Sequence, residues 1–389
     1  MPLAKVSADP APRSAYIHVP FCARRCGYCN FTLVAGRDDL IEPYLSALSR
    51  ELSLLQTRCE VDTLFIGGGT PTHLKGSALK RLLELLLFWH PLAAGHEFTV
   101  EANPGDLDEQ SVALLTDHGV TRVSLGAQSF NRDKLRALER EHSAADIQRS
   151  VELLRSHGLD VSLDLIFAAP AESLDLWHAD LEAAVSLAPV HLSTYGLTFE
   201  RGTSFWNRRH RGELSTADEE IERAMYESAI DRLTLAGFDH YEVSNFAQPG
   251  KRCRHNEAYW LGQSYYGAGP GAARYLHGVR SMNHRSTTTY IRRVLAGRSA
   301  VAESERLDPR DRALELLVFA LRRTEGVERA WFQTRTGMEL DSLVGGLIQE
   351  LASRRLMIDS KAGVRLTREG LLLSDGIFAR MLTSNTIAA

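Results

Sequence analysis

Three features are scarce in this 389-residue chain: long apolar runs, an excess of basic residues, and cysteine. The longest apolar stretch, residues 82–91, is interrupted by Glu84 and is far too short to span a bilayer. The first residues, MPLAKVSADPAPRS, lack the apolar segment of a secretory signal, so we expect a cytoplasmic protein. The 45 Lys and Arg residues against 49 Asp and Glu residues leave a net charge of -4, which argues against a dedicated nucleic-acid binder.

Five cysteines are too few for a disulfide scaffold, and an odd number leaves one unpaired. Cys22, Cys26 and Cys29 fall close together, whereas Cys59 and Cys253 are isolated and are expected to be ordinary packed thiols. Clustered thiols in a reducing compartment indicate metal chemistry.

What the chain does contain is a repeated alternation of β-type runs and helical periodicity. Strands are predicted at residues 15–20, 62–66, 97–101, 122–125, 161–167 and 191–197, and helices at 40–55, 77–89, 108–118, 144–157, 174–187 and 217–236. Successive β-α units imply parallel strands with right-handed crossovers. Because the first turn has no Gly-rich dinucleotide fingerprint, we predict an α/β fold with a partial (β/α)6 barrel of the TIM type, with its functional groups at the C-terminal ends of the strands.

The pattern changes after residue 236. Residues 238–290 are rich in Gly, Tyr, His and Asn without clear periodicity, and predict loops and strands. Helices are then predicted at 309–322, 328–336 and 340–354, a hairpin at 356–359 and 364–366, and a last helix from 368; this resembles a winged-helix module, although its scattered Arg residues argue against DNA binding. The predicted organisation is a tail (1–14), a barrel (15–237), an extension (238–306), a small α+β domain (307–380) and a tail (381–389).

The segment YIHVPFCARRCGYCNF places Cys22-x3-Cys26-x2-Cys29 directly after the first strand. Thiolates suit iron–sulfur clusters or zinc. A structural zinc site needs four ligands, so zinc would require a distant residue such as His18 or Cys253. Three thiolates on a four-iron cluster leave one iron open to a small-molecule chelator, and the spacing favours this interpretation.

Glycine and polar residues follow the other strands. The glycines of IGGGTPT let a backbone approach a ligand closely and offer N–H groups to a carboxylate, or else form a plain tight turn. Glu101 ends the third strand, where its carboxylate can accept hydrogen bonds from ribose hydroxyls or an ammonium. Asp164 lies within an apolar strand, where an ionisable group is costly unless paired. Gln128, Arg140 and His142 lie near strand ends; each alone is more often structural, but together they predict a polar ring around a cofactor.

At the cysteine loop the chain resembles the radical S-adenosylmethionine (SAM) superfamily, whose signature is this spacing. The motifs GGGTPT, EANP, LGAQSF, DLIFAAP, HLSTYGLTFERGT, YEVSNFA, RHNEAYW and GAGPGAARY follow in order. Together they resemble the oxygen-independent coproporphyrinogen III oxidase family, and specifically its haem-chaperone (HemW-like) branch, over about residues 14–380. The resemblance implies a [4Fe–4S] cluster on Cys22, Cys26 and Cys29, SAM chelated to its open iron, and a C-terminal domain of the HemN type.

Carried over residue by residue, the resemblance implies SAM contacts at Tyr16, Tyr28, Gly68, Gly69, Thr70, Glu101, Gln128, Arg140 and Asp164. In the oxidase some of these positions serve a second SAM, and the sequence leaves open whether this chain binds one. HNEAYW matches a motif associated with haem in the chaperone branch: His255 can ligate iron, while Tyr259 and Trp260 offer flat apolar faces. The alternative is a capped turn with His255 bonded to backbone and the aromatic rings in the core. The glycines of GAGPG would admit a planar ligand or form a tight turn.

Two departures separate the chain from the oxidase. Asn30 and Phe31 follow Cys29 where the oxidase has a further cysteine, and only 15 residues precede Tyr16 where the oxidase has a longer arm. The resemblance therefore implies a chaperone that delivers haem to apoproteins. It assigns no catalytic residue and leaves open whether the chain is an enzyme.

Three alternatives stay open. They are decarboxylation of coproporphyrinogen III to protoporphyrinogen IX, another radical reaction on a tetrapyrrole, and a DNA-binding sensor that uses the cluster as a redox switch. The implied partners are haem-accepting apoproteins and an electron donor such as a flavodoxin or ferredoxin. A homodimer and a peripheral membrane contact during haem delivery are left open, and a nucleic-acid partner is not expected.

Overall fold

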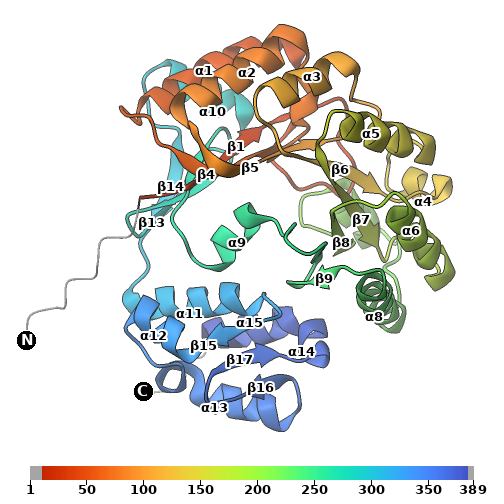
Figure 1. Cartoon of the computed structure of the whole chain (residues 1–389), viewed down its shortest axis with the longest axis vertical. Helices are drawn as coiled ribbons and strands as arrows, with labels where there is room; N and C mark the ends of the chain where they lie inside the picture. The colour runs from red at the N-terminus through yellow and green to blue at the C-terminus, as the bar shows by residue number, and fades with distance from the viewer. Residues whose placement is uncertain (1–10, 384–389) are drawn as a thin grey trace, which may run out of the picture. The chain divides into compact units, whose positions relative to one another are not determined.

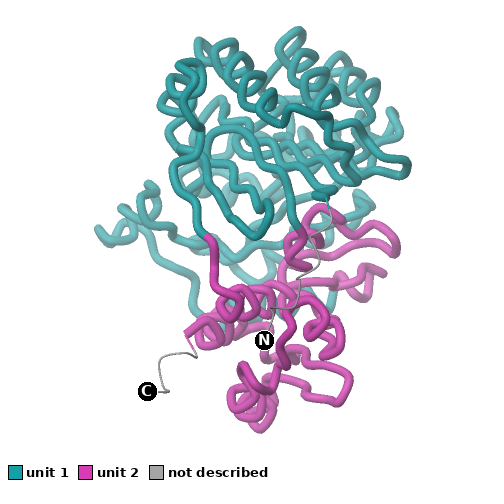
Figure 2. The backbone as a smooth tube through the Cα atoms, turned by 90° about the vertical axis from the view of Figure 1, so that its left-hand side faces the viewer, with its two compact units in different colours: residues 1–232, 264–305 teal, residues 233–263, 306–389 magenta. Residues whose placement is uncertain are grey.

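The computed structural model describes residues 11–383 and divides into two compact units (Figure 2). Unit 1, in teal, comprises the residues up to 232 together with 264–305. Unit 2, in magenta, comprises 233–263 and the residues from 306 onward. The segment 238–306, which the sequence presents as one extension, is thus divided between the units. No helix in the described part of the chain is long and apolar enough to cross a membrane.

Unit 1 is built on a parallel sheet with the strand order β11-β1-β4-β5-β6-β7-β8. These strands are β1 (Ser14–Val19), β4 (Val61–Gly68), β5 (Leu92–Ala102), β6 (Arg122–Gln128), β7 (Asp160–Phe167), β8 (His191–Gly196) and β11 (Tyr266–Ala268). The strands predicted in the barrel are all confirmed. The sequence analysis does not predict β11, which extends the sheet beside β1, where Ala15 pairs with Tyr266.

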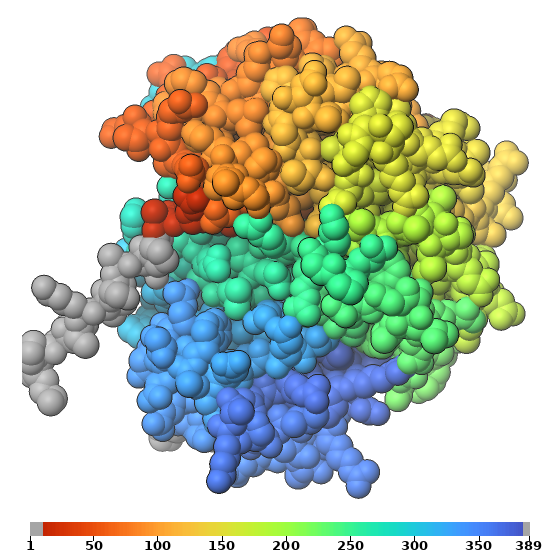
Figure 3. Space-filling view, viewed as in Figure 1, coloured from red at the N-terminus to blue at the C-terminus, as the bar shows by residue number. Residues whose placement is uncertain are grey.

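Helices cover the outer side of this sheet, as Figure 1 shows in ribbons and Figure 3 in space-filling form from orange to yellow. They are α1 (Ile41–Ser53), α2 (Gly76–Trp89), α3 (Glu109–Asp117), α5 (Ala144–Ser156), α6 (Leu174–Ser186) and α8 (Glu219–Leu235). Two shorter helices, α4 (Arg132–Ala137) and α7 (Ser204–His210), follow β6 and β8. The helices predicted in the barrel are confirmed, whereas α4 and α7 are additional. Both lie in loops and span only 6 and 7 residues, too few to show a helical period.

Short polar side chains fix where these helices begin. Asp108 accepts a hydrogen bond from the Ser111 N–H, and Ser143 accepts one from the Asp146 N–H. In both cases the later side chain bonds back, which completes a capping box and satisfies N–H groups that have no partner within the helix. The helices therefore start directly after the loops at the strand ends.

The core of unit 1 lies between the sheet and the helices. Side chains from both layers are completely covered, namely Ile17, Leu64, Ile66, Phe98, Val100, Val123, Leu125, Leu163 and Leu165 from strands and Leu45, Leu48, Leu82, Leu86, Leu115 and Leu154 from helices. Parallel strands are covered on both faces, so their sequences are almost continuously apolar. A polar group in such a strand therefore marks a special position.

After β11, unit 1 continues with an antiparallel sheet, β12 (Ala273–Leu276), β13 (Val279–Asn283) and β14 (Val301–Glu305), and with α10 (Thr287–Leu295). The prediction that residues 238–290 contain only loops and strands is wrong, because α9 (Arg254–Trp260) and the start of α10 lie within this range. Helix α10 begins with three threonines, which are poor helix formers and obscure its period.

Unit 2 confirms the predicted winged-helix-like arrangement. It contains the hairpin β9 (Asp239–His240) and β10 (Asn245–Ala247), then α9, α11 (Pro309–Leu321), β15 (Val327–Glu328), α12 (Arg329–Thr336), α13 (Leu340–Ser353), β16 (Met357–Asp359), β17 (Gly363–Leu366), α14 (Arg368–Leu372) and α15 (Ser374–Thr383). Strands β15, β17 and β16 form an antiparallel sheet in that order. The predicted tails are shorter than expected, since β1 begins at Ser14 and α15 runs to Thr383; residues 1–10 and 384–389 lie outside the described part.

Candidate functional site

The three clustered cysteines lie on one closed loop after β1. The loop opens with β2 (Phe21–Cys22) and closes with β3 (Val34–Ala35), and these two short strands pair in parallel. Within the loop, the Cys29 N–H donates to the Cys26 carbonyl oxygen at 3.1 Å. The structure thus places the three sulfur atoms on a single backbone segment that is held at both ends.

The chemistry of these thiols fits a metal cluster. Burial raises the pKa of Cys22 to about 11 despite a hydrogen bond with Thr70, and the nearby Cys29 and Cys26 raise it further. Burial also raises the pKa of Cys29. A bound metal cation opposes such shifts because it stabilises thiolates. Three soft sulfur donors fit an iron–sulfur cluster, of which they would hold three irons.

The zinc alternative requires a fourth ligand, and His18 is already engaged within the chain. Its Nε2 lies 2.6 Å from the Thr32 carbonyl oxygen, and its Nδ1 lies 3.1 Å from the Tyr16 hydroxyl. Burial lowers the pKa of His18 to about 4, which keeps the ring neutral. The other candidate, Cys253, belongs to unit 2 and is the N-cap residue of α9.

The glycine run at the end of β4 packs directly against its neighbours. The Gly68 N–H donates to Glu101 Oε2 at 2.9 Å, and the N–H groups of Gly69 and Thr70 donate to the carbonyl oxygens of Val19 and Phe21 at 2.8 and 2.7 Å. A Cβ at Gly69 would lie 2.6 Å from the Phe21 oxygen, which only glycine avoids. The expectation that these N–H groups are free for a carboxylate is therefore wrong in this conformation.

Two half-buried acids, Glu101 and Asp164, lie at the same end of the sheet. Burial raises the pKa of Glu101 to about 7; the Gly68 N–H opposes this rise, and the Asp164 charge adds to it. Burial likewise raises the pKa of Asp164 to about 6, against hydrogen bonds from Ser193 and Ser124 and the attraction of Arg140. The Ser124 hydroxyl lies 3.2 Å from both carboxylate oxygens of Asp164. Neighbouring acids with raised pKa values are suited to a cationic ligand, which would favour their ionised forms.

Two further predicted residues, Arg140 and Tyr28, lie close to Cys26. Arg140 Nη1 donates to Cys26 Sγ at 3.6 Å, and Nη2 donates to the Gly126 carbonyl oxygen at 2.9 Å. Tyr28 packs edge-on against Phe205 with ring centroids 6.0 Å apart, and burial raises the pKa of its hydroxyl.

The end of β6 changes direction at Gln128, which takes a positive φ of 62°. This conformation is uncommon for a residue other than glycine and bends the backbone there. His142, in the loop that follows, is bonded within the chain, since its Nε2 lies 2.8 Å from the Ala127 carbonyl oxygen.

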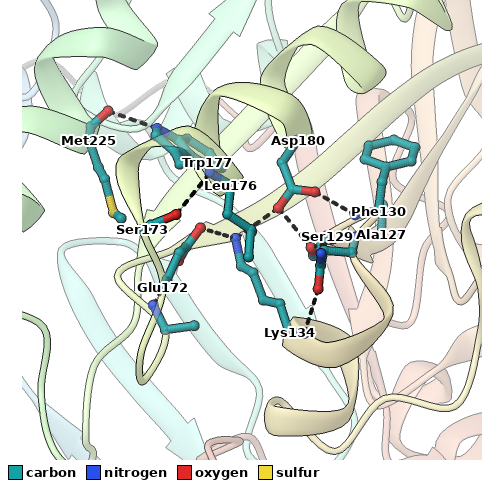
Figure 4. Close-up of polar contacts among 12 residues, drawn as sticks. Ala127, Ser129, Phe130, Lys134, Glu172, Ser173, Leu176, Trp177, Asp180 and Met225 are labelled. Atoms are coloured by element: carbon teal, nitrogen blue, oxygen red, sulfur yellow. Dashed lines mark hydrogen bonds and ion pairs between the residues drawn. The ribbon is translucent and has the colours of Figure 1, made fainter.

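A buried charge network anchors the segment that leads from β6 to Arg140 (Figure 4). Lys134 Nζ donates to Glu172 at 2.5 Å and to Asp180 at 2.9 Å, and the Lys134 side chain is only 2% exposed. The Ser129 hydroxyl and the Phe130 N–H each donate to Asp180 at 2.7 Å. The network ties the loop after β6 to α6. Sequence analysis does not find it, because its members are far apart in the chain.

The segment after β11 braces the cysteine loop from another side. Glu51, buried on α1, accepts hydrogen bonds from the Gly269 N–H at 3.0 Å and from the side chains of Asn283 and Tyr290 at 2.7 and 2.6 Å. Arg285 Nη2 donates to the Asn30 carbonyl oxygen at 2.7 Å. A Cβ at Gly269 would lie 2.3 Å from the His18 carbonyl oxygen. This glycine of GAGPG thus serves the packing of the chain on itself.

The HNEAYW motif lies on α9 in unit 2, a helix of 7 residues, so the capped turn of the alternative interpretation is not observed. His255 is 1% exposed, its Nε2 lies 2.8 Å from the Tyr259 hydroxyl, and burial lowers its pKa to about 3. Trp260 packs with Tyr241 in a small hydrophobic cluster. As the structural alternative expects, Trp260 lies in a core, and His255 is covered.

The predicted residues therefore form one connected group in unit 1 and a separate one in unit 2. Contacts or electrostatic interactions connect Tyr16 with Glu101, Gly68 with Glu101, Thr70 with Cys22, Tyr28 with Arg140, Arg140 with Cys26, and Asp164 with Arg140 and Glu101. His255 belongs to unit 2. Asn103 is a further member of this group that was not predicted; its amide donates to Thr70 Oγ1 at 2.7 Å, and its position in EANP, directly after β5, is the sequence signal for it.

Comparisons with known proteins agree with this geometry. Residues 16–184 match the model of the radical SAM superfamily, and residues 307–373 match that of the HemN C-terminal domain. The chain is 35% identical to the heme chaperone HemW of Lactococcus lactis over 95% of this chain and 97% of that protein. It is 34% identical to HemW of Bacillus subtilis, over 95% and 99%, and 33% identical to HemW of Escherichia coli, over 95% and 98%.

Among solved structures, the coproporphyrinogen III oxidase HemN from Escherichia coli, described as a radical SAM enzyme, superposes with a TM-score of 0.85 and 22% identity. The match covers 96% of this chain and 91% of that one. At this identity the likeness concerns the fold, and it confirms the predicted α/β barrel with its small C-terminal domain.

Proposed function

This chain belongs to the HemW family of radical SAM proteins, and we propose that it is a haem chaperone that holds a [4Fe–4S] cluster and SAM and delivers haem to apoproteins. The observation that carries the proposal is the 35% identity to a heme chaperone over 97% of that protein's length. A match of that extent includes the cysteine loop of unit 1 and the α9 segment of unit 2. The acceptors would be apoproteins that need haem, and a flavodoxin or ferredoxin would supply electrons to the cluster.

In unit 1, Cys22, Cys26 and Cys29 would hold three irons and leave the fourth to SAM. In the superfamily the reduced cluster supplies one-electron cleavage of SAM, whereas the proposal for this chain concerns binding. The half-buried acids Glu101 and Asp164 support it, because their raised pKa values favour a cationic ligand such as the ammonium and sulfonium of SAM. Tyr16, Gly68, Gly69 and Thr70 would line the same site, together with Tyr28, Gln128 and Arg140.

In unit 2, we assign the haem contact to His255. Iron binds the neutral imidazole, and the lowered pKa of His255 keeps it neutral at physiological pH. Its Nε2 lies against the Tyr259 hydroxyl, so haem would have to displace this hydrogen bond before ligation. We therefore expect haem binding to require a local opening of α9.

A haem titration of anaerobically reconstituted protein, followed in the Soret region, tests the proposal. We expect saturable binding of one haem per chain that weakens in His255→Ala. Unchanged binding in His255→Ala would support a haem chaperone but would show that haem binds elsewhere than at His255. If binding does not saturate and coproporphyrinogen III releases carbon dioxide in the presence of SAM and reductant, the protein is an oxidase and the proposal fails.

A further inference from the structure

We propose that Asn103 is a positioning residue that holds hydrogen-bond donors against the sulfur atoms of Cys22 and Cys26 and thereby raises the reduction potential of the cluster. The inference rests on the cluster part of the proposed function and is independent of haem delivery. Asn103 is half-buried and lies in the loop directly after β5. It does not contact sulfur itself and would act through two neighbours.

An unbroken polar chain connects the two sulfur atoms through Asn103. Arg140 Nη1 donates to Cys26 Sγ at 3.6 Å, and the other terminal nitrogen, Nη2, donates to Asn103 Oδ1. Asn103 Nδ2 then donates to Thr70 Oγ1 at 2.7 Å, and Thr70 Oγ1 lies 3.4 Å from Cys22 Sγ. This series of hydrogen bonds therefore joins residues from the loops after β4, β5 and β6 to the first β-α loop.

The direction of each hydrogen bond follows from the chemistry of the groups. A guanidinium only donates, so the carbonyl oxygen of Asn103 must face Arg140 and the amide nitrogen must face Thr70. Since the Thr70 hydroxyl oxygen accepts from that amide, its own proton is available to the Cys22 sulfur. Both sulfur atoms thus face a donor, and Asn103 sets the orientation of both.

Donors at the cluster sulfurs stabilise its reduced, more negative state and so raise the reduction potential. Loss of the Asn103 side chain would affect the two donors differently. Arg140 also donates to the Gly126 carbonyl oxygen and keeps that anchor, whereas Thr70 loses the amide that orients its hydroxyl. We therefore expect the larger effect at Cys22.

The test is a redox titration of full-length protein carrying the cluster, followed by electron paramagnetic resonance. In Asn103→Leu we expect the ratio of reduced to oxidised cluster at the wild-type midpoint to fall about tenfold, the factor of one hydrogen bond to a charged group, or about 59 mV for a one-electron couple. Asn103→Asp, which keeps the acceptor for Arg140 but loses the donor to Thr70, should shift in the same direction. Thr70→Ser, which keeps the hydroxyl, should retain the wild-type potential. Thr70→Val, which removes the hydroxyl, should lower the potential as Asn103→Leu does.

The matched control is Gln148→Leu, an exposed amide of the same unit on α5 that donates to Glu152 and takes no part in the hydrogen bonds to sulfur. Its cluster should titrate as wild type. A wild-type potential in cluster-loaded Asn103→Leu, or in Asn103→Asp if the first variant does not assemble a cluster, would overturn the inference. Failure of the wild-type protein itself to assemble a cluster would instead overturn the proposed function.

Discussion

The cysteine loop of unit 1 and the α9 segment of unit 2 differ in how their polar groups are satisfied. Around the cysteines, burial raises the pKa of Cys22 to about 11 and of Glu101 to about 7, so burial disfavours the ionised forms of both groups. In α9, His255 is neutral, covered and hydrogen-bonded to Tyr259. We therefore expect the first site to bind cationic ligands directly and the second to bind haem only after a local opening. The cysteine motif and the HNEAYW motif are equally recognisable in the sequence, but their side chains differ in whether they already have hydrogen-bond partners within the chain.

The largest expected effect comes from breaking the cysteine site. In Cys26→Ser the cluster should be lost, because the harder hydroxyl oxygen is a poor ligand for iron–sulfur irons. Iron analysis and visible absorption after anaerobic reconstitution would show a fall from about four irons per chain to almost none. Cys59→Ser, which changes an isolated thiol, should retain the wild-type iron content, and an unaffected Cys26→Ser would refute the assignment of the loop.

The next largest effect is a loss of stability when the buried charge network around Lys134 is broken. Lys134→Met removes the one cation between Glu172 and Asp180 and should lower the free energy of unfolding by about 3–5 kcal/mol, because two buried carboxylates lose their partner. Urea denaturation measures the loss. Arg149→Ala, which removes an exposed ion pair with Asp146, should cost less than about 1 kcal/mol. Equal losses in both variants would show that the network does not anchor the loop.

A smaller effect is the pH dependence of SAM affinity in unit 1, which arises from Glu101. The folded-state pKa of Glu101 is raised to about 7, so the carboxyl is protonated below that value, and a cationic ligand must displace the proton. SAM affinity should therefore fall about tenfold between pH 8 and pH 6, with Asp164 adding to the loss near pH 6. Calorimetric titration across this range measures it, and Glu101→Gln should flatten the profile above pH 6. The same steep fall in Glu101→Gln would contradict the role of Glu101.

The smallest expected effect concerns α9. Tyr259→Phe removes the hydroxyl that engages His255, so haem should bind about fivefold more tightly, the equilibrium factor of a hydrogen bond of about 1 kcal/mol. Soret titration measures the change, with Tyr290→Phe, which loses a hydroxyl bonded to Glu51 in unit 1, as the control. Weaker haem binding in Tyr259→Phe would mean that the Tyr259 hydroxyl supports haem rather than opposing it.

Sequence patterns predict those parts of the molecule that repeat or cluster locally. The alternation of apolar strands with helices predicts the sheet from β1 to β8, and three cysteines close together predict the loop on which they lie. The short helices α4, α7 and α9 are not predicted, because 6 or 7 residues are too few to show a helical period. Likewise β11 is only 3 residues long and becomes a strand by pairing with β1.

Contacts between distant residues are the part that sequence does not predict. Glu51 and Tyr290 lie 239 positions apart, and Lys134 and Asp180 lie 46 apart, so no local pattern connects them. Asn103 occurs in a motif that was identified, yet its role depends on Thr70 and Arg140 folding beside it. The cysteine loop and the covered His255 likewise differ in their tertiary surroundings, which a single sequence does not show.

The most direct test of the central claim is haem transfer from the loaded protein to an apo haem enzyme, followed by the Soret shift in a stopped-flow instrument. If the protein transfers haem within a complex with its acceptor, the rate depends on how often that complex forms. We therefore expect a transfer rate that rises with acceptor concentration, and less haem transferred by His255→Ala, because this variant binds haem more weakly and carries less of it. A rate independent of acceptor concentration, equal to the dissociation of haem into solution, would contradict it.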